Sequence, residues 1–232
     1  MRRYEHKIWK SFDRCFVVSE KDRELMKEAT RQKTEILPNG VDIDYFCPDG
    51  MKVKPFSLIY TGQMDWYPNE DAVVYFLENI YPLIKIQVPE VSFWIVGKDP
   101  SEKIKKFAKK DKSIIITGFV DDVRSYIAQA EVMVVPLRIG SGTRLKILEA
   151  MAMAKPVVST SVGCEGLEVT DGKNIVLADE PASFARKVIE LFNNPSLVKK
   201  IGNAGRILTE EKYSWKKISE KLSSIVSQEL DI

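Results

Sequence analysis

The segment of residues 136–149 (PLRIGSGTRLKILE) carries the densest set of side chains that could do chemistry. Gly140 and Gly142 allow the backbone to turn sharply and to come close to a ligand. Ser141 and Thr143 are hydroxyl donors of the type that caps a helix. The free N–H groups at the start of a helix attract anions. The segment therefore predicts an anion-binding helix start.

Two cations occupy the first turn of this predicted helix, Arg144 and Lys146. Cations there oppose the helix dipole by roughly 0.3–1 kcal/mol, so a bound anion such as a diphosphate explains them better than helix stability does. Glu149 lies six residues beyond Thr143, about 9 Å along the axis. A nucleoside diphosphate could place its phosphates on the helix start and its ribose hydroxyls on this carboxylate. The alternative is an ordinary capped helix with a Lys146–Glu149 surface pair.

Other loops that follow predicted strands carry weaker signals. In residues 60–69, Gly62 comes directly after a strand and Asn69 could cap the next helix, but a lone glycine also fits a simple turn. In residues 118–120, Phe119 could stack on a base, although packing in the core is the favoured interpretation. These loops are candidates because ligands of open α/β sheets sit beyond the carboxyl ends of the strands.

The sequence lacks the sets of residues that several kinds of catalysis and metal binding require. His6 is the only histidine and has no acid-base partners, and no Ser/His/Asp set, HExxH motif or metal-ligand cluster is present. The three cysteines are far apart and odd in number, which argues against a disulfide framework and favours a reducing cytoplasm. Residues 103–112 hold six lysines, for which a solvated helix face is favoured over an anionic membrane surface.

The composition is that of a globular protein. The 232 residues are 44% hydrophobic and 29% charged, enough to bury one large core. Thirty-five Lys and Arg against 33 Asp and Glu give a net charge of +2, which does not suggest nucleic-acid binding. No apolar run approaches the roughly 18 residues that span a bilayer, and no signal peptide is visible.

From residue 55 onward, strand-like and helix-like segments alternate. Short apolar runs predict strands at residues 56–61, 91–96, 113–117, 131–135, 156–160 and 174–177. Amphipathic segments predict helices at residues 69–88, 101–110, 122–130, 144–154, 181–193, 195–212 and 215–229, the last capped by Ser214. Continuous apolar strands separated by helices indicate an α/β fold with a Rossmann-like, doubly wound parallel sheet.

The first fifty residues stand apart from this alternation. They predict a helix at 1–12, a strand at 14–19, a helix at 20–30 and a strand at 34–38. Two strands and two helices are too few for an independent core, so they look like the end of another α/β domain. We therefore expect a remnant at 1–48, the main domain at 49–212 and a terminal helix at 213–232.

The chain resembles the C-terminal, donor-binding half of glycosyltransferase family 4 enzymes, which have the GT-B fold. The matching strings are residues 17–20 (VVSE), 37–42 (LPNGVD), 60–69 (YTGQMDWYPN), 95–97 (IVG), 117–122 (TGFVDD), 142–152 (GTRLKILEAMA), 155–159 (KPVVS) and 213–215 (YSW). The likeness extends to a subgroup with W-x-P-N and G-T-R-L-K-I-L-E-A-M motifs, which is associated with bacterial surface polysaccharide assembly. Residues 1–48 would then be the end of an acceptor domain, to which the terminal helix crosses back.

The resemblance implies retaining transfer of a sugar from a nucleotide diphosphate-sugar, with no required metal or other cofactor. By position, Glu149 matches the second glutamate of the family's E-x7-E motif, which holds the donor ribose. The resemblance assigns no catalytic residue. The donor-binding residues that it implies, with those argued above, are Gly62, Gln63, Gly118, Phe119, Val120, Ser141, Gly142, Thr143, Arg144, Leu145, Lys146 and Glu149.

The sequence departs from the family pattern at three places. Ser141 stands where the first glutamate of E-x7-E contacts the donor sugar. The arginine and lysine of the first loop are replaced, with Gln63 at the arginine position and residues 68–69 near the lysine position. We hypothesise that Arg144 and Lys146 neutralise the diphosphate instead.

Taken together, the sequence favours a glycosyltransferase donor half in the cytoplasm or at the inner membrane face, acting on a sugar or lipid-linked acceptor. The apolar face of the terminal helix would be exposed or paired, with a separate acceptor-domain chain or a second copy as partner. One alternative is a nucleotide-sugar-binding module that is inactive without that partner, and another is a Rossmann-like domain that binds no nucleotide. A dinucleotide oxidoreductase is disfavoured, because Gly140-x-Gly142 lacks the third glycine of its motif.

Overall fold

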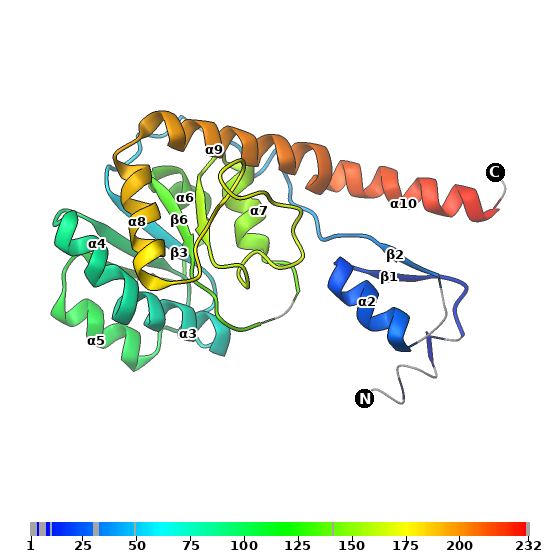
Figure 1. Cartoon of the computed structure of the whole chain (residues 1–232), viewed down its shortest axis with the longest axis horizontal. Helices are drawn as coiled ribbons and strands as arrows, with labels where there is room; N and C mark the ends of the chain where they lie inside the picture. The colour runs from blue at the N-terminus through cyan, green and yellow to red at the C-terminus, as the bar shows by residue number, and fades with distance from the viewer. Residues whose placement is uncertain are drawn as a thin grey trace.

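The computed structural model describes residues 4, 8–9, 11–29, 33–48, 50–140 and 142–230 (Figure 1). They form a large α/β domain, a small N-terminal unit and a long final helix. The helix predicted at residues 1–12 lies largely outside the described residues. Among the residues that are described, no helix combines the length and the apolar character needed to cross a membrane.

The large domain is built on one parallel sheet of six strands. In chain order these are β3 (Ser57–Thr61), β4 (Ser92–Val96), β5 (Ile114–Gly118), β6 (Val132–Val135), β7 (Val157–Ser159) and β8 (Val176–Leu177). Their order across the sheet is β5-β4-β3-β6-β7-β8, so the strand order reverses between β3 and β6. The predicted doubly wound, Rossmann-like sheet is confirmed, and this reversal is where such sheets bind ligands.

Burial on both faces explains why these strands read as continuous apolar runs. Every residue of β3, β4 and β6 is buried. The covering helices are α3 (Tyr67–Tyr75), α4 (Tyr81–Gln87), α5 (Glu102–Lys110), α6 (Arg124–Gln129), α7 (Leu145–Ala152), α8 (Pro181–Phe192) and α9 (Pro195–Leu208). On α5, Lys103 pairs with Glu78 at 3.1 Å and Lys105 with Glu102 at 2.8 Å, as on a solvated helix face.

Two predicted helices are interrupted by a π-helical turn. The helix predicted at residues 69–88 begins two residues earlier and contains η1 (Phe76–Ile80) between α3 and α4. Pro82, at the start of α4, has no N–H to continue the regular hydrogen-bond ladder. The second turn, η2 (Thr209–Tyr213), follows α9 and leads to α10 (Trp215–Leu230). Ser214 Oγ accepts a hydrogen bond from the Lys217 N–H at 3.3 Å, so the predicted cap is confirmed.

The N-terminal unit consists of β1 (Cys15–Val17), α2 (Glu20–Ala29) and β2 (Thr34–Ile36), with the two strands parallel. The strand-helix-strand prediction for this region is confirmed. The chain leaving β2 pairs with the start of α10 through a Val41–Ser214 bridge. At Gly40 a Cβ atom would lie 2.7 Å from the Trp215 ring, so only glycine fits this approach.

The apolar face of α10 is unevenly covered. Ile218 and Ile225 are buried, whereas Trp215 and Leu222 are exposed. The helix extends away from the sheet on the side where the N-terminal unit lies (Figure 1). The expectation that part of this face is exposed is therefore met in the described chain.

Candidate functional site

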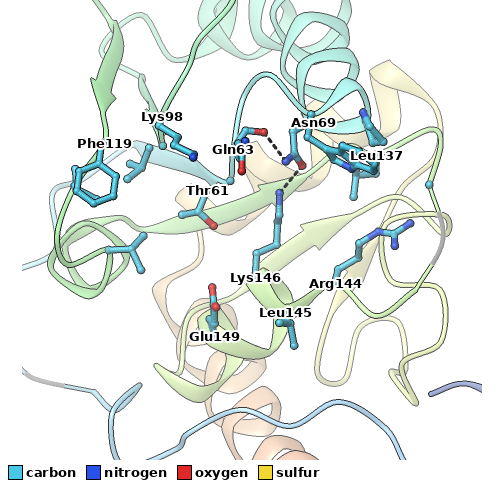
Figure 2. A pocket seen from close by; sticks show the side chains of 18 of the residues that line it. Thr61, Gln63, Asn69, Lys98, Phe119, Leu137, Arg144, Leu145, Lys146 and Glu149 are labelled. Atoms are coloured by element: carbon cyan, nitrogen blue, oxygen red, sulfur yellow. Dashed lines mark hydrogen bonds between the residues drawn. The ribbon is translucent and has the colours of Figure 1, made fainter. Parts of the chain in front are cut away.

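A cavity of about 670 Å³ lies at the switch point of the sheet, beyond the carboxyl ends of β3, β4 and β6. Such a volume falls in the range of small-molecule sites. The residues that line it are Thr61, Gly62, Gln63, Trp66, Pro68, Asn69, Val96, Gly97, Lys98, Phe119, Val120, Val123, Leu137, Gly140, Thr143, Arg144, Leu145, Lys146 and Glu149. Segments that are up to 88 positions apart in the sequence thus meet at one site (Figure 2).

Most of the residues singled out from the sequence lie in this cavity. Those that line it are Gly62, Gln63, Phe119, Val120, Thr143, Arg144, Leu145, Lys146 and Glu149. Gly118 and Gly142 flank it without being part of its lining, and Ser141 lies outside the described residues. The structure therefore brings the β3 loop, the β5 loop and the α7 start together, as the topology of the sheet requires.

Lys146 reaches across the cavity to the β3 loop. Its Nζ donates a hydrogen bond to Asn69 Oδ1 at 3.0 Å (Figure 2). The same Nζ lies 3.8 Å from the centroid of the Tyr60 ring. Within the described part of the chain it forms no ion pair with a carboxylate. The alternative of a Lys146–Glu149 surface pair is therefore wrong, because a tertiary contact outcompetes the helical neighbour.

Asn69 is the centre of this small network. Its Oδ1 also accepts from the Tyr60 hydroxyl at 2.7 Å, and its Nδ2 donates to the Gln63 carbonyl at 2.8 Å. Asn69 does not cap α3, as the sequence suggested, because the helix begins at Tyr67 with Trp66 as its N-cap. A proline in the first turn sets the earlier start. Tyr60 and Asn69 were not among the predicted site residues.

Two glycines let the strand-end loops approach closely. Gly97 has a φ of +146°, and a Cβ atom there would lie 1.8 Å from the Gly62 carbonyl oxygen. Gly62 has a φ of +150°, and its Cβ would lie 3.0 Å from Lys146 Nζ. A side chain at position 97 would displace the backbone of the β3 loop, and one at position 62 would displace the side chains of Asn69 and Lys146. In the sequence, Gly97 was singled out only within residues 95–97, one of the strings that resemble the family.

The start of α7 has no side-chain cap. Its N-cap is Arg144, and neither an N-cap hydrogen bond nor an acidic residue in the first turn is present. Thr143 does not cap the helix as expected, and its buried Oγ1 has no hydrogen-bond partner among the described residues. Buried hydroxyls are nearly always paired, so an unpaired one beside a free helix start points to a ligand.

The two cations of this turn point in different directions. The Arg144 guanidinium donates to the Gly142 carbonyl and lies beside Gly140, whereas Lys146 points to Asn69 (Figure 2). Burial lowers the pKa of Arg144, and the Glu165 carboxylate opposes that shift. Of these two cations, Lys146 faces the interior of the cavity, and Arg144 lies at its edge, where it binds the Gly142 carbonyl.

Burial also changes the titration of the groups inside the cavity. It lowers the pKa of Lys146 to about 7; Glu149 opposes this shift and Arg144 adds to it. Burial raises the pKa of the Glu149 carboxyl, against the effect of Lys146. A bound anion near this buried lysine would stabilise its charged form and so raise its pKa again. In the described residues, no group of three or more His, Cys, Asp or Glu side chains is placed to hold a metal ion.

Phe119 corrects one expectation from the sequence. The core was the favoured location for this ring, but its side chain is 72% exposed at the rim of the cavity (Figure 2). Phe119 follows directly after β5, which is an edge strand of the sheet. An exposed aromatic ring beside a cavity is a surface on which a flat ligand can stack.

Residues 55–194, which contain all of the cavity, match the sequence profile of the family described as "Glycosyl transferases group 1". This chain belongs to that family. An uncharacterised 44.6 kDa protein in the cps region of Klebsiella pneumoniae is 28% identical over 216 residues, which cover 90% of this chain and 54% of the relative.

Two of the solved structures that share the fold of this group 1 member contain UDP. TarM of S. aureus, as a mutant in complex with fondaparinux, alpha-GlcNAc-glycerol and UDP, superposes with a TM-score of 0.82 at 20% identity, over 96% of this chain and 45% of TarM. HepE of Anabaena, in complex with UDP and glucose, gives a TM-score of 0.76 at 15% identity, over 97% of this chain and 66% of HepE. The chain spans about half the length of the curated relatives it matches.

Proposed function

We propose that this chain is the donor-binding half of a glycosyltransferase and that its cavity holds a nucleotide diphosphate-sugar. One observation carries the proposal. The Lys146 ammonium lies in the cavity without a carboxylate partner in the described chain, beside an uncapped helix start and a buried, unpaired Thr143 hydroxyl. All three features favour a bound diphosphate.

Each part of the donor would then have its own partner. The diphosphate lies at the start of α7 and against Lys146, and the ribose hydroxyls bind the Glu149 carboxylate on the same side of the helix. The base lies along residues 118–120, where Phe119 offers an exposed ring. As the glycosidic bond breaks, negative charge grows on the leaving diphosphate, and Lys146 and the helix start stabilise it.

The likeness to the family supports the further features of the reaction. We propose that transfer retains the anomeric configuration and requires no metal, and that the acceptor is a sugar or a lipid-linked sugar. The likeness to the subgroup associated with bacterial surface polysaccharide assembly, together with the relative in the cps region of Klebsiella pneumoniae, favours a role in cell-surface polysaccharide synthesis. The complexes of HepE with UDP and glucose favour a UDP-sugar among the possible donors.

A second candidate is a nucleotide-sugar-binding module that is inactive by itself. Binding alone requires only the donor cavity, and residues 61–149 of this chain supply all of its lining. Residues 1–48 would be the end of an acceptor domain, and residues 213–232 would cross back to it. Glycosyl transfer assayed with and without a candidate acceptor-domain chain separates the two candidates.

Titration calorimetry with UDP, GDP, ADP and dTDP tests the proposal. At least one nucleotide should bind. Lys146→Met should lower the affinity for it about 10- to 100-fold, since a charged hydrogen bond contributes about 1.5–3 kcal/mol. Lys200→Met, an exposed lysine on α9, is the matched control and should bind as the wild type does.

A second variant separates the ribose from the phosphates. Glu149→Gln should weaken the nucleoside diphosphate but leave the affinity for inorganic pyrophosphate unchanged, because pyrophosphate has no ribose. A wild-type chain that binds none of the four nucleotides at millimolar concentration would refute the donor-binding function. It would favour a Rossmann-like domain without a nucleotide.

A further inference from the structure

A second, smaller hollow adjoins the cavity. Its volume is about 330 Å³, and it is lined by Gln63, Asp65, Trp66 and Asn69. Gln63, Trp66 and Asn69 also line the main cavity, so the two spaces share one wall. A ligand that fills the main cavity therefore has room to extend past the β3 loop into this hollow.

The side chains of the hollow are of the types that recognise a sugar ring. Trp66 is 65% exposed although its indole is large and mostly apolar. The Asp65 carboxylate and the Gln63 side-chain amide form no hydrogen bond or ion pair within the described residues. A flat ring can cover the C–H face of a sugar, and a free carboxylate and amide can bind its hydroxyls.

Asn69 connects the hollow to the phosphate end of the main cavity. The Asn69 Oδ1 that accepts from Lys146 Nζ at 3.0 Å belongs to a residue that lines both spaces. The ribose partner Glu149 lines only the main cavity. If the diphosphate lies against Lys146 with its ribose toward Glu149, the group on its other end lies toward the hollow. This step rests on the proposed function.

We propose that residues 63–66 form the donor-sugar subsite, in which Trp66 packs on the face of the transferred sugar and Asp65 and Gln63 bind its hydroxyls. These residues therefore determine which sugar is accepted. A sugar whose hydroxyls match the carboxylate and the amide is favoured, because its hydrogen bonds replace those that these exposed groups make with water in the free protein.

The neighbouring Tyr67 provides a matched control. It is 67% exposed, nearly the same as Trp66, and it lines neither the cavity nor the hollow. Replacing Tyr67, the first residue of α3, removes a similar exposed aromatic ring at the adjacent position without changing the proposed subsite. An effect of Trp66→Ala that is absent from Tyr67→Ala can therefore be assigned to the hollow.

The experiment compares nucleotides with nucleotide sugars on the full 232-residue chain, by calorimetry, with UDP and UDP-glucose and with GDP and GDP-mannose. Trp66→Ala should lower the affinity for the nucleotide sugar that the wild type binds about 5- to 30-fold. It should change the affinity for the corresponding nucleoside diphosphate by less than about twofold, the loss being confined to the sugar. Trp66→Phe should restore most of the loss, and Tyr67→Ala should change neither affinity.

The outcomes distinguish this inference from the function on which it rests. If the wild type binds a nucleotide but Trp66→Ala weakens nucleotide and nucleotide sugar equally, or weakens neither, the subsite is refuted and the donor site stands. Equal effects of Trp66→Ala and Tyr67→Ala would refute it too. If the wild type binds none of the four ligands, the proposed function fails, and the subsite fails with it.

Discussion

The ammonium of Lys146 donates to Oδ1 of Asn69 across 3.0 Å, although the two residues are 77 positions apart in the chain. The contact joins the start of α7 to the first turn of α3, on either side of the point where the strand order reverses. The same oxygen accepts from the Tyr60 hydroxyl. The cation is thus held by a neutral amide and an aromatic ring, which leaves its charge free to meet an anion.

The affinity for a nucleotide sugar should depend on pH through Lys146. Because burial lowers the pKa of Lys146 to about 7, the free protein loses this charge as the pH rises above 7. A bound diphosphate favours the charged form, so binding takes up a proton and weakens as the pH rises from 6 to 9. Calorimetry in two buffers of different ionisation enthalpy measures this uptake. A nucleotide sugar is the best ligand, because its diphosphate has no terminal phosphate group to titrate.

Lys146→Arg is the control for this pH dependence. Arginine keeps its charge throughout the range, so the variant should show no proton uptake between pH 7 and 9. The other titratable groups that face Lys146 are Glu149, Arg144 and Tyr60. Burial raises the pKa of Glu149, whose protonation would weaken binding on the acid side instead. Wild-type affinity that stays constant from pH 6 to 9 would contradict the role of Lys146.

The stability of the free protein should change with pH in the opposite direction. Lys146 titrates near 7 in the folded chain and at its ordinary value of 10.5 in the unfolded chain. Between these values the unfolded state binds more protons, so the contribution of Lys146 to the free energy of unfolding rises with pH across this window. The urea midpoints of the wild type and of Lys146→Met at pH 7 and 9 measure it. The difference between the two proteins should shift in favour of the wild type at pH 9.

The Asn69 network should also stabilise the fold. Asn69→Ala would leave the buried Tyr60 hydroxyl and the Lys146 ammonium without their oxygen partner, at a cost of about 1–3 kcal/mol in the free energy of unfolding. Tyr60→Phe removes only one donor and should cost about 0.5–1.5 kcal/mol. Because both changes break the same hydrogen bond, the double variant should lose less than the sum of the two.

Chemical denaturation of these variants can be compared with Asn79→Ala. Asn79 is exposed, and the one side-chain hydrogen bond that it makes within the described residues goes to the Tyr75 carbonyl, so its loss should change the free energy of unfolding by less than about 0.5 kcal/mol. An Asn69→Ala protein as stable as the Asn79→Ala protein would show that the network does not support the fold.

The sequence predicted the sheet well because its strands are buried on both faces. Continuous apolar runs such as residues 131–135 are a local signal, and each of the six main strands lies where such a run occurs. The main errors concern side chains whose partners are distant in the chain. Helical spacing paired Lys146 with Glu149, but Asn69 is its partner, and a loop position made Phe119 exposed where its apolar character favoured the core.

The starts of two helices show the same limit of prediction from the sequence, because the partners of their side chains could not be predicted from local residues. The residue types at Asn69 and Thr143 are good caps, yet Asn69 bonds across the cavity and Thr143 bonds to nothing in the described chain. Local propensity is a weak preference of about 1 kcal/mol, which a buried tertiary network can override. A side chain suited to a cap that does not cap its helix is therefore a signal of a site, although it becomes visible only in the structure.

The approach of Gly97 to Gly62 should make Gly97→Ala the most damaging small change near the cavity. A Cβ atom would lie 1.8 Å from the Gly62 carbonyl oxygen, and φ is +146°, so the β3 loop would have to move. We expect a loss of more than about 3 kcal/mol in the free energy of unfolding. The remaining folded protein should also bind nucleotide more weakly, since the Gly62 loop lines the cavity.

Gly172→Ala is the control, because its φ is +69° but no atom lies within 4 Å of the added Cβ. Its cost should be about 1–2 kcal/mol, from backbone conformation alone, with the nucleotide affinity unchanged. If the two variants lost equal stability, backbone conformation and not the contact between the loops would be what requires glycine at position 97.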